Sequence, residues 1–130
     1  MKTMNPVSKT AQKILDRLFA GMEPGTSKKI DNAKGTFMAL SVERLSENTF
    51  SMAHYFEQNG DLVADPDMEF WRDAQGQFFC VGLTQVMGFY TRAITEFEGG
   101  KPSRFSPGAM KDLNSFATLW CRNIAQQQGV

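Results

Sequence analysis

Residues 50–57 read FSMAHYFE, and this stretch decides the fold that the sequence predicts. Phe50, Met52 and His54 take every second position, and small or polar residues lie between them. A period of two is typical of a β-strand that buries one face. The pair Asn59-Gly60 follows and favours a tight turn. The stretch therefore predicts one arm of a β-hairpin with a single apolar face.

Alternation on both sides of this stretch predicts about five antiparallel strands between residues 37 and 97. Asp65-Pro66 predicts a break, because proline forces the preceding residue out of the α region. Apolar residues on both faces of one segment indicate a central strand, and Gly88 is expected to mark a bulge. The predicted strands cover residues 37–42, 50–56, 68–72, 78–83 and 87–97.

A helix is predicted at each end of the chain. Apolar residues recur at helical spacing after Asn5 and Ser8, either of which suits the N-cap, and Gly21 suits the C-terminal stop. Ser106 and Pro107 are typical of a helix start, and a wide apolar stripe follows them. The stripes of both helices need a partner, and the apolar face of the sheet supplies one.

The predicted fold class is α+β, with an antiparallel meander and the C-terminal helix packed on one face of it. A chain of 130 residues fits one domain of about 100–200 residues. The expected single domain, residues 1–130, comprises an N-terminal helix (1–21), a loop (22–36), the sheet (37–97) and a C-terminal helix (106–126).

Charge is balanced overall but unevenly distributed. Lys plus Arg and Asp plus Glu both number 14, which argues against a nucleic-acid coat or a polybasic membrane binder. Residues 35–98 carry ten of the acidic residues and only three of the basic ones. The middle of the chain is therefore an acidic body between two mildly basic ends, and it is a candidate contact surface.

The sequence predicts a cytoplasmic protein without a membrane segment. Cys80 and Cys121 form no C-x-x-C pair and lie in apolar settings, which favours two buried free thiols in a reducing compartment. A single disulfide in an exported protein is the alternative. No apolar stretch follows Lys2 as a secretory signal would require, and no run approaches the length of a membrane span.

The candidate site lies around the predicted turn. His54 is the sole histidine, so it is either a hydrogen-bonded core residue or the one possible histidine base or ligand. Acidic residues follow it closely and suit either a divalent cation or ordinary turn chemistry. The carboxylates are Glu57, Asp61, Asp65, Asp67 and Glu69. The candidate cluster as a whole is His54, Tyr55, Glu57, Gln58, Asn59, Asp61, Asp65 and Asp67.

Other catalytic signatures are absent from the sequence. There is no G-x-x-x-x-G-K-[ST] loop, no G-x-G-x-x-G turn and no G-x-S-x-G elbow. We assign no catalytic residue and expect no cofactor. The sequence therefore favours a protein that is not an enzyme. Aromatic residues on strands could stack on single-stranded nucleic acid, but the strands lie in the acidic part of the chain, which repels phosphates.

The stretch from His54 to Phe70, HYFEQNGDLVADPDMEF, resembles the signature of domain of unknown function 6908. Residues 37–43, the run Gly88-Phe89-Tyr90, and the last helix with its Gln-rich exit are also similar to that family. The resemblance implies a bacterial, cytoplasmic protein encoded on plasmids or integrative elements. It implies no catalytic role, but it indicates that one set of residues matters together: His54, Tyr55, Glu57, Gln58, Asn59, Gly60, Asp61, Asp65 and Pro66.

Three hypotheses follow from the sequence. The first is a small non-enzymatic accessory factor of a mobile element that binds an unidentified protein partner, with contacts sensitive to salt. The second is a metal-dependent or acid–base enzyme that uses the segment from His54 to Asp67. The third is a single-stranded nucleic-acid binder. The oligomeric state and the strand order are not predicted.

Overall fold

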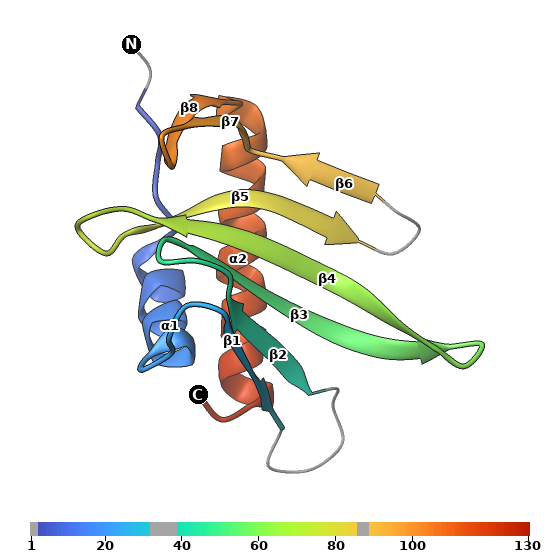
Figure 1. The fold of residues 1–130 in the computed structure, drawn as a ribbon. Coiled ribbons are helices and arrows are strands. Elements are labelled where there is room, and N and C mark those ends of the chain that lie inside the picture. The colour runs from blue at the N-terminus through green and yellow to red at the C-terminus, as the bar shows by residue number, and fades with distance from the viewer. Residues whose placement is uncertain (1–2, 32–38, 86–88) are drawn as a thin grey trace.

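The computed structural model describes residues 3–31, 39–85 and 89–130, without the side chains of residues 56–58 and 62–65. Six antiparallel strands form one sheet in the order of the chain, and a separate two-stranded sheet precedes the last helix (Figure 1). The elements are α1 (Lys9–Phe19), β1 (Thr26–Ile30), β2 (Leu40–Arg44), β3 (Thr49–Gln58), β4 (Asp61–Arg72), β5 (Phe78–Gln85), β6 (Phe89–Arg92), β7 (Ile94–Glu98), β8 (Lys101–Phe105) and α2 (Pro107–Gln127). The α+β class is confirmed, and the six strands of the main sheet form an antiparallel meander.

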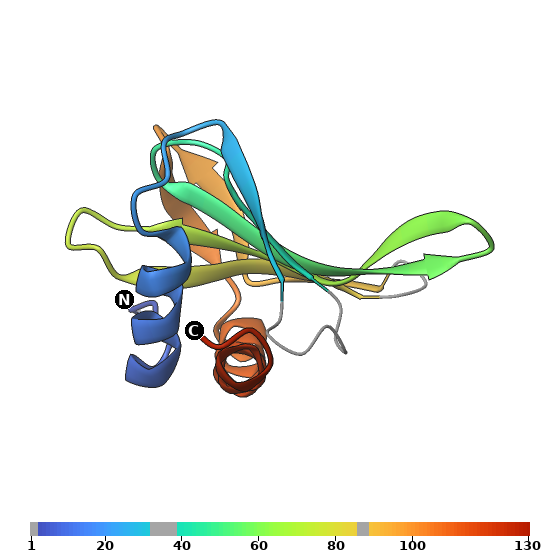
Figure 2. The same cartoon turned by 90° about the horizontal axis from the view of Figure 1, so that it is seen from below.

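Both helices cover the same face of the six-stranded sheet (Figure 2). Serine side chains start them as predicted: Ser8 accepts from the Ala11 N–H at 3.2 Å, and Ser106 accepts from the Ala109 N–H at 3.3 Å. The hydroxyls of Ser8 and Thr118 lie 2.7 Å apart and join the helices. The two helices and the sheet therefore form a two-layer arrangement with one apolar core.

A cluster of phenylalanine rings fixes α1 to the sheet. The ring centroid of Phe19 lies 4.8 Å from that of Phe50, and Phe50 lies 5.3 Å from Phe78. The guanidinium carbon of Arg72 lies 4.6 Å from the centre of the Phe50 ring and shields the cluster at its end. Arg44 donates to the backbone carbonyls of Met22 and Glu47 and ties the end of β2 to the neighbouring loops.

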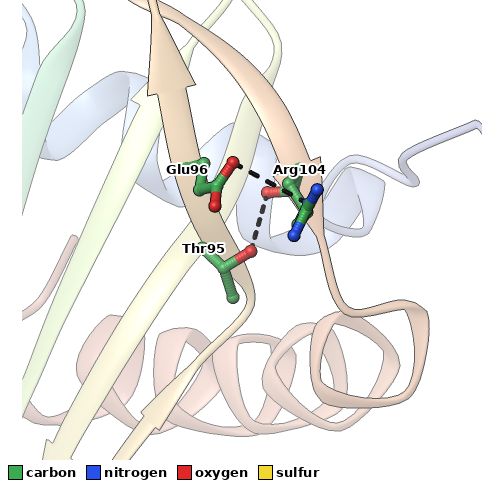
Figure 3. Close-up of polar contacts among 3 residues, drawn as sticks. All are labelled: Thr95, Glu96 and Arg104. Carbon is green, nitrogen blue, oxygen red and sulfur yellow. Dashed lines mark hydrogen bonds and ion pairs between the residues drawn. The ribbon is translucent and has the colours of Figure 1, made fainter.

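The second sheet lies on the other side of the main sheet from the helices (Figure 2). The Trp71 indole N–H donates to the Gly100 carbonyl at 3.1 Å, which holds the β7–β8 turn over Trp71 and its neighbour Phe79. This contact explains why β5 is buried on both faces, as predicted for a central strand. Within the hairpin, Arg104 pairs with Glu96 at 3.8 Å, and Thr95 donates to the Arg104 carbonyl (Figure 3).

The strand count of about five was wrong, and one missing strand lies in the predicted loop. Residues 22–36 contain β1, which pairs with β2 along its whole length. Its sequence, TSKKI, has no apolar alternation and so gave no sign of a strand. An edge strand does not need such a pattern, because its hydrogen-bond ladder can hold it while its side chains stay exposed. The helix predicted over residues 1–21 occupies only Lys9–Phe19.

Two further strand boundaries differ from the prediction. Asp65-Pro66 does not break the strand: Ala53 pairs with Asp67 and Tyr55 with Ala64, so two residues of β4 lie opposite one of β3. This β-bulge accommodates a proline that cannot donate to the ladder. The strand predicted over residues 87–97 is divided at Ala93, because β7 leaves the main sheet to pair with β8. Gly88 lies outside the described residues.

The turn between β3 and β4 confirms the expectation for Asn59-Gly60. Asn59 has φ 53° and Gly60 has φ 86°, the left-handed pair of a type I′ turn. Replacing Gly60 by Ala should lower the free energy of unfolding by about 1 kcal/mol, because a Cβ at this φ is strained. Gly108→Ala, in the first turn of α2, should raise it by about 0.5 kcal/mol. Urea unfolding of both variants checks this, and equal effects would contradict the turn assignment.

Candidate functional site: the outer face of the sheet

The face of the sheet away from α1 and α2, here called the outer face, is set by strand register. Residues opposite each other in antiparallel strands share a face, so two rows of side chains cross it from β1 to β6. One row is Ser27, Glu43, Ser51, Glu69, Gly82 and Arg92, and the other is Lys29, Ser41, Ala53, Asp67, Thr84 and Tyr90. Carboxylates therefore occupy the middle strands, and the cations Lys29 and Arg92 lie on the edge strands.

Two adjoining grooves hollow the outer face, with volumes of about 250 and 260 Å³. They share Glu43, Ser51 and Asp67. The aromatic side chain of Tyr90 lines one groove, and that of Tyr55 lines the other. The grooves are shallow and mainly polar, which suits the uptake of a chain segment better than the enclosure of a small apolar molecule.

Three carboxylates meet in these grooves. Partial burial raises the pKa of Asp67, and the nearby charge of Glu43 raises it further. Partial burial also raises the pKa of Glu69; Arg92 acts in the opposite direction, and Asp67 adds to the rise. Like charges held together and partly shielded from water oppose ionisation of one another. The outer face thus holds negative charge at a cost in stability.

Gly82 makes room for Tyr90 on this face. A Cβ placed on Gly82 would lie 2.6 Å from the Tyr90 hydroxyl oxygen, closer than real contacts allow. The absence of a side chain lets the Tyr90 ring lie across β5 over Gly82, in the row that contains Glu69 and Arg92. Glycine here serves the close approach of a neighbouring side chain rather than a turn.

His54 lies on the opposite face and in the core. It is 7% exposed, and its Nδ1 accepts a hydrogen bond from the Trp120 indole N–H at 3.3 Å. Because Nδ1 is an acceptor, the neutral ring carries its proton on Nε2. Burial lowers the pKa of His54, and a hydrogen bond with the Gln128 side chain opposes that shift. These contacts tie β3 to the end of α2.

The structure separates the predicted cluster into different places. Tyr55 and Asp67 line a groove on the outer face, and His54 is buried under α2. Asn59 forms the turn, and Asp61 is exposed beside it. The side chains of Glu57, Gln58 and Asp65 lie outside the described residues, so the structure places only their backbone in β3 and β4.

Sequence reasoning did not assign Glu43 and Tyr90 to the site. Glu43 is 24 positions before Asp67, and only the register of β2, β3 and β4 brings the two together. A signal was nevertheless available, since Glu43 and Ser51 alternate with residues of the apolar face. Among the described residues, no three His, Cys, Asp or Glu side chains are arranged to hold a metal ion.

The two cysteines are free and buried in the core, as expected. Burial raises the pKa of Cys121 to about 12 and raises that of Cys80 still more strongly. The Cys80 thiol donates to the Asn114 side-chain oxygen at 3.3 Å. Thiols of this kind are inert as nucleophiles near neutral pH.

Comparison with known families bears on the resemblance seen in the sequence. The family model described as Domain of unknown function (DUF6908) matches residues 9–130. The chain belongs to this family. No curated protein and no solved structure matches the chain. In the described part of this DUF6908 chain, neither helix is both long enough and apolar enough to cross a membrane.

The buried His54 predicts a loss of stability in acid. Its folded-state pKa is below the ordinary value of 6.5, so the unfolded chain binds more protons as pH falls below 6.5. The contribution of His54 to the free energy of unfolding should be fully present above pH 6.5 and should be lost progressively below it. Urea unfolding of wild type and His54→Asn from pH 8 to 5 checks this. A difference between the two proteins that does not vary with pH would contradict it.

Asp67 predicts the opposite sign. Its folded-state pKa is raised, so the native state binds more protons and stability falls as pH rises from the ordinary value of 3.8 through the raised value. Asp67→Asn should raise the free energy of unfolding at pH 7 by about 0.5 kcal/mol, the scale of a like-charge contact between strands. The gain should vanish in acid. Asp61→Asn, at an exposed position, is the matched control and should change stability little.

Proposed function

We propose that the protein is a non-enzymatic binding module that takes up a positively charged, extended segment of a partner protein on its outer face. The observation that carries this proposal is the group of three carboxylates, Glu43, Asp67 and Glu69, held together in open grooves at the middle of the sheet. A cation entering the grooves would relieve their mutual repulsion. The binding energy therefore comes from charge that the fold already holds in place.

The shape and lining of the grooves support a chain segment as the ligand. The two grooves adjoin at Glu43, Ser51 and Asp67, so one ligand can contact both. Tyr55 and Tyr90 lie on separate grooves and offer aromatic faces to lysine or arginine side chains. Ser41, Ser51 and Thr84 supply hydroxyl groups for the backbone of an extended peptide.

Neither rival function receives the same support from the described residues. Phosphates of a nucleic acid would meet the three carboxylates at the middle of the outer face. An acid–base mechanism needs His54 beside a carboxylate, but His54 hydrogen-bonds Trp120 in the core, on the other side of the sheet from Asp67. A binding role needs neither a nucleophile nor a titrating histidine.

The biological setting of the proposal comes from the family resemblance. We infer a bacterial cytoplasmic protein, encoded on a plasmid or integrative element, that acts as an accessory factor by binding a protein partner. The two free cysteines agree with a reducing compartment. A neutral chain with an acidic outer face selects its partner by local charge rather than by overall attraction.

A fluorescent hexa-arginine peptide tests the outer face directly. It should bind the wild-type protein at low salt and weaken steeply as salt is added, because the contacts are ionic. Neutralising the three carboxylates together, Glu43→Gln with Asp67→Asn and Glu69→Gln, should weaken binding at least about tenfold, which corresponds to about 1.4 kcal/mol. Fluorescence anisotropy measures both effects.

The matched control removes the same charge elsewhere. Glu23→Gln, Glu47→Gln and Asp112→Asn lie at exposed positions in the loop after α1, the β2–β3 turn and α2. This triple variant should retain nearly all of the affinity. Equal weakening by both triple variants, or no binding by the wild type, would overturn the proposal. Tighter binding of a single-stranded oligonucleotide than of the peptide would favour the nucleic-acid hypothesis instead.

A further inference from the structure

The six-stranded sheet ends in two different edges. β1 and β6 are the outermost strands, and no described residue pairs with the outer side of either (Figure 1). An edge strand offers unpaired N–H and C=O groups to another strand, and proteins that stay monomeric usually protect such edges with charge or proline. The two edges of this sheet differ in that protection.

β1 carries two lysines, whereas β6 carries one arginine and no lysine or proline. β1 has the sequence TSKKI, and its two adjacent lysines discourage pairing with a second strand. β6 has the sequence FYTR and contains neither lysine nor proline. Phe89 is 70% exposed and Tyr90 is 53% exposed, so this short edge carries two large aromatic side chains in solvent. Exposed aromatic residues on a free strand edge mark a contact surface.

The direction of the free hydrogen-bonding groups of β6 follows from one bond. The Ala93 N–H donates to the Val81 carbonyl at 2.8 Å and so points toward β5. Main-chain groups alternate in direction along a strand, so those of Thr91 also point toward β5. The N–H and C=O groups of Tyr90 and Arg92 therefore point outward. Four outward-facing groups at alternate positions are what an antiparallel partner strand requires.

We propose that a second copy of this chain binds here, with the two β6 strands paired antiparallel about a twofold axis at Thr91. In this register Tyr90 lies opposite Arg92 of the second copy, and the two residues exchange both main-chain hydrogen bonds. Symmetry repeats the exchange, which gives four bonds. Thr91 then lies opposite itself in a non-hydrogen-bonded pair, with a Cα separation of about 4.5 Å.

The side chains suit this self-pairing. The Tyr90 ring lies over Gly82 and the Arg92 Nε donates to the Ile94 carbonyl at 2.7 Å, so both side chains are held within their own chain and leave the main-chain edge open. The same pairing of β1 about Lys28 would place two lysines directly opposite each other, which is destabilising. Avoidance of like-charge contacts therefore favours β6 over β1 as the edge that joins two copies.

The dimer would join the two outer faces into one continuous surface. Antiparallel pairing about an axis perpendicular to the sheet keeps both outer faces on the same side. Arg92 of the second copy would extend the row that contains Asp67, Thr84 and Tyr90. The two chains have no net charge and do not repel each other at long range. The pairing stands on the edge strand alone and does not depend on what the outer face binds.

Cysteine crosslinking at Thr91 tests the register. Thr91→Cys places two thiols opposite each other, so mild oxidation should convert most of the protein to a covalent dimer. The native cysteines give little background, because both are buried with raised pKa values. Ser27→Cys, exposed on the other edge strand, is the matched control and should crosslink far less. Equal crosslinking of the two variants would overturn the proposed register.

Sedimentation equilibrium tests the association itself. Wild-type protein should shift from monomer to dimer between about 10 µM and about 1 mM, a range that covers weak association. Thr91→Lys places like charges opposite each other and should raise the dissociation constant at least about tenfold. Ser27→Lys should leave it unchanged, and circular dichroism confirms folding. A wild type that stays monomeric throughout, or a dimer insensitive to Thr91→Lys, would overturn the proposal. A monomeric wild type would leave the free edge of β6 available to a strand of another protein.

Discussion

The packing of Phe19 and Phe78 around Phe50 is the interaction on which the rest of the structure depends. It fixes which face of the sheet is buried, and a strand has only two faces. Every residue that alternates with this cluster is then assigned to the outer face. Glu43 and Asp67 are there because each lies next to a residue buried on the inner face, Val42 and Met68 respectively. The candidate site is thus a consequence of the core.

Much of the fold could be predicted because it is encoded locally. Helix caps at Ser8 and Ser106, the Asn59-Gly60 turn and the alternation around Phe50 each depend on residues close together in the chain. The meander order also follows from short connections between neighbouring strands. The position of His54 was predictable in the same way, since it shares a face with Phe50 and Met52, and the structure gives it a hydrogen-bond partner in Trp120.

The parts that could not be predicted depend on pairing between distant segments. β1 is held by β2 and carries no pattern of its own, and β7 leaves the main sheet only because β8 and Trp71 provide contacts for it. The candidate site also depends on pairing between distant segments. Single-sequence reasoning gathered carboxylates that are close in sequence, whereas register gathers Glu43 with Asp67 across three strands. Proximity in the chain was a poor guide to proximity on the sheet.

His54 in β3 and Asp67 in β4 contribute to the free energy of unfolding with opposite pH dependence. This difference distinguishes the cost of burial in the core from the cost of charge on the outer face. The cost of burying His54 is absent above pH 6.5, where the ring is neutral and its hydrogen bonds are compatible with the core. The cost of partial burial and like-charge repulsion at Asp67 and Glu69 persists there, because it acts on the charged form of both carboxyl groups. At neutral pH the remaining strain therefore lies on the face that solvent and ligands can reach. Core packing does not require carboxylates at these positions, since Glu43, Asp67 and Glu69 line open grooves rather than the core. The cationic partner proposed here would account for them, because it would convert the repulsion that the fold tolerates into binding energy.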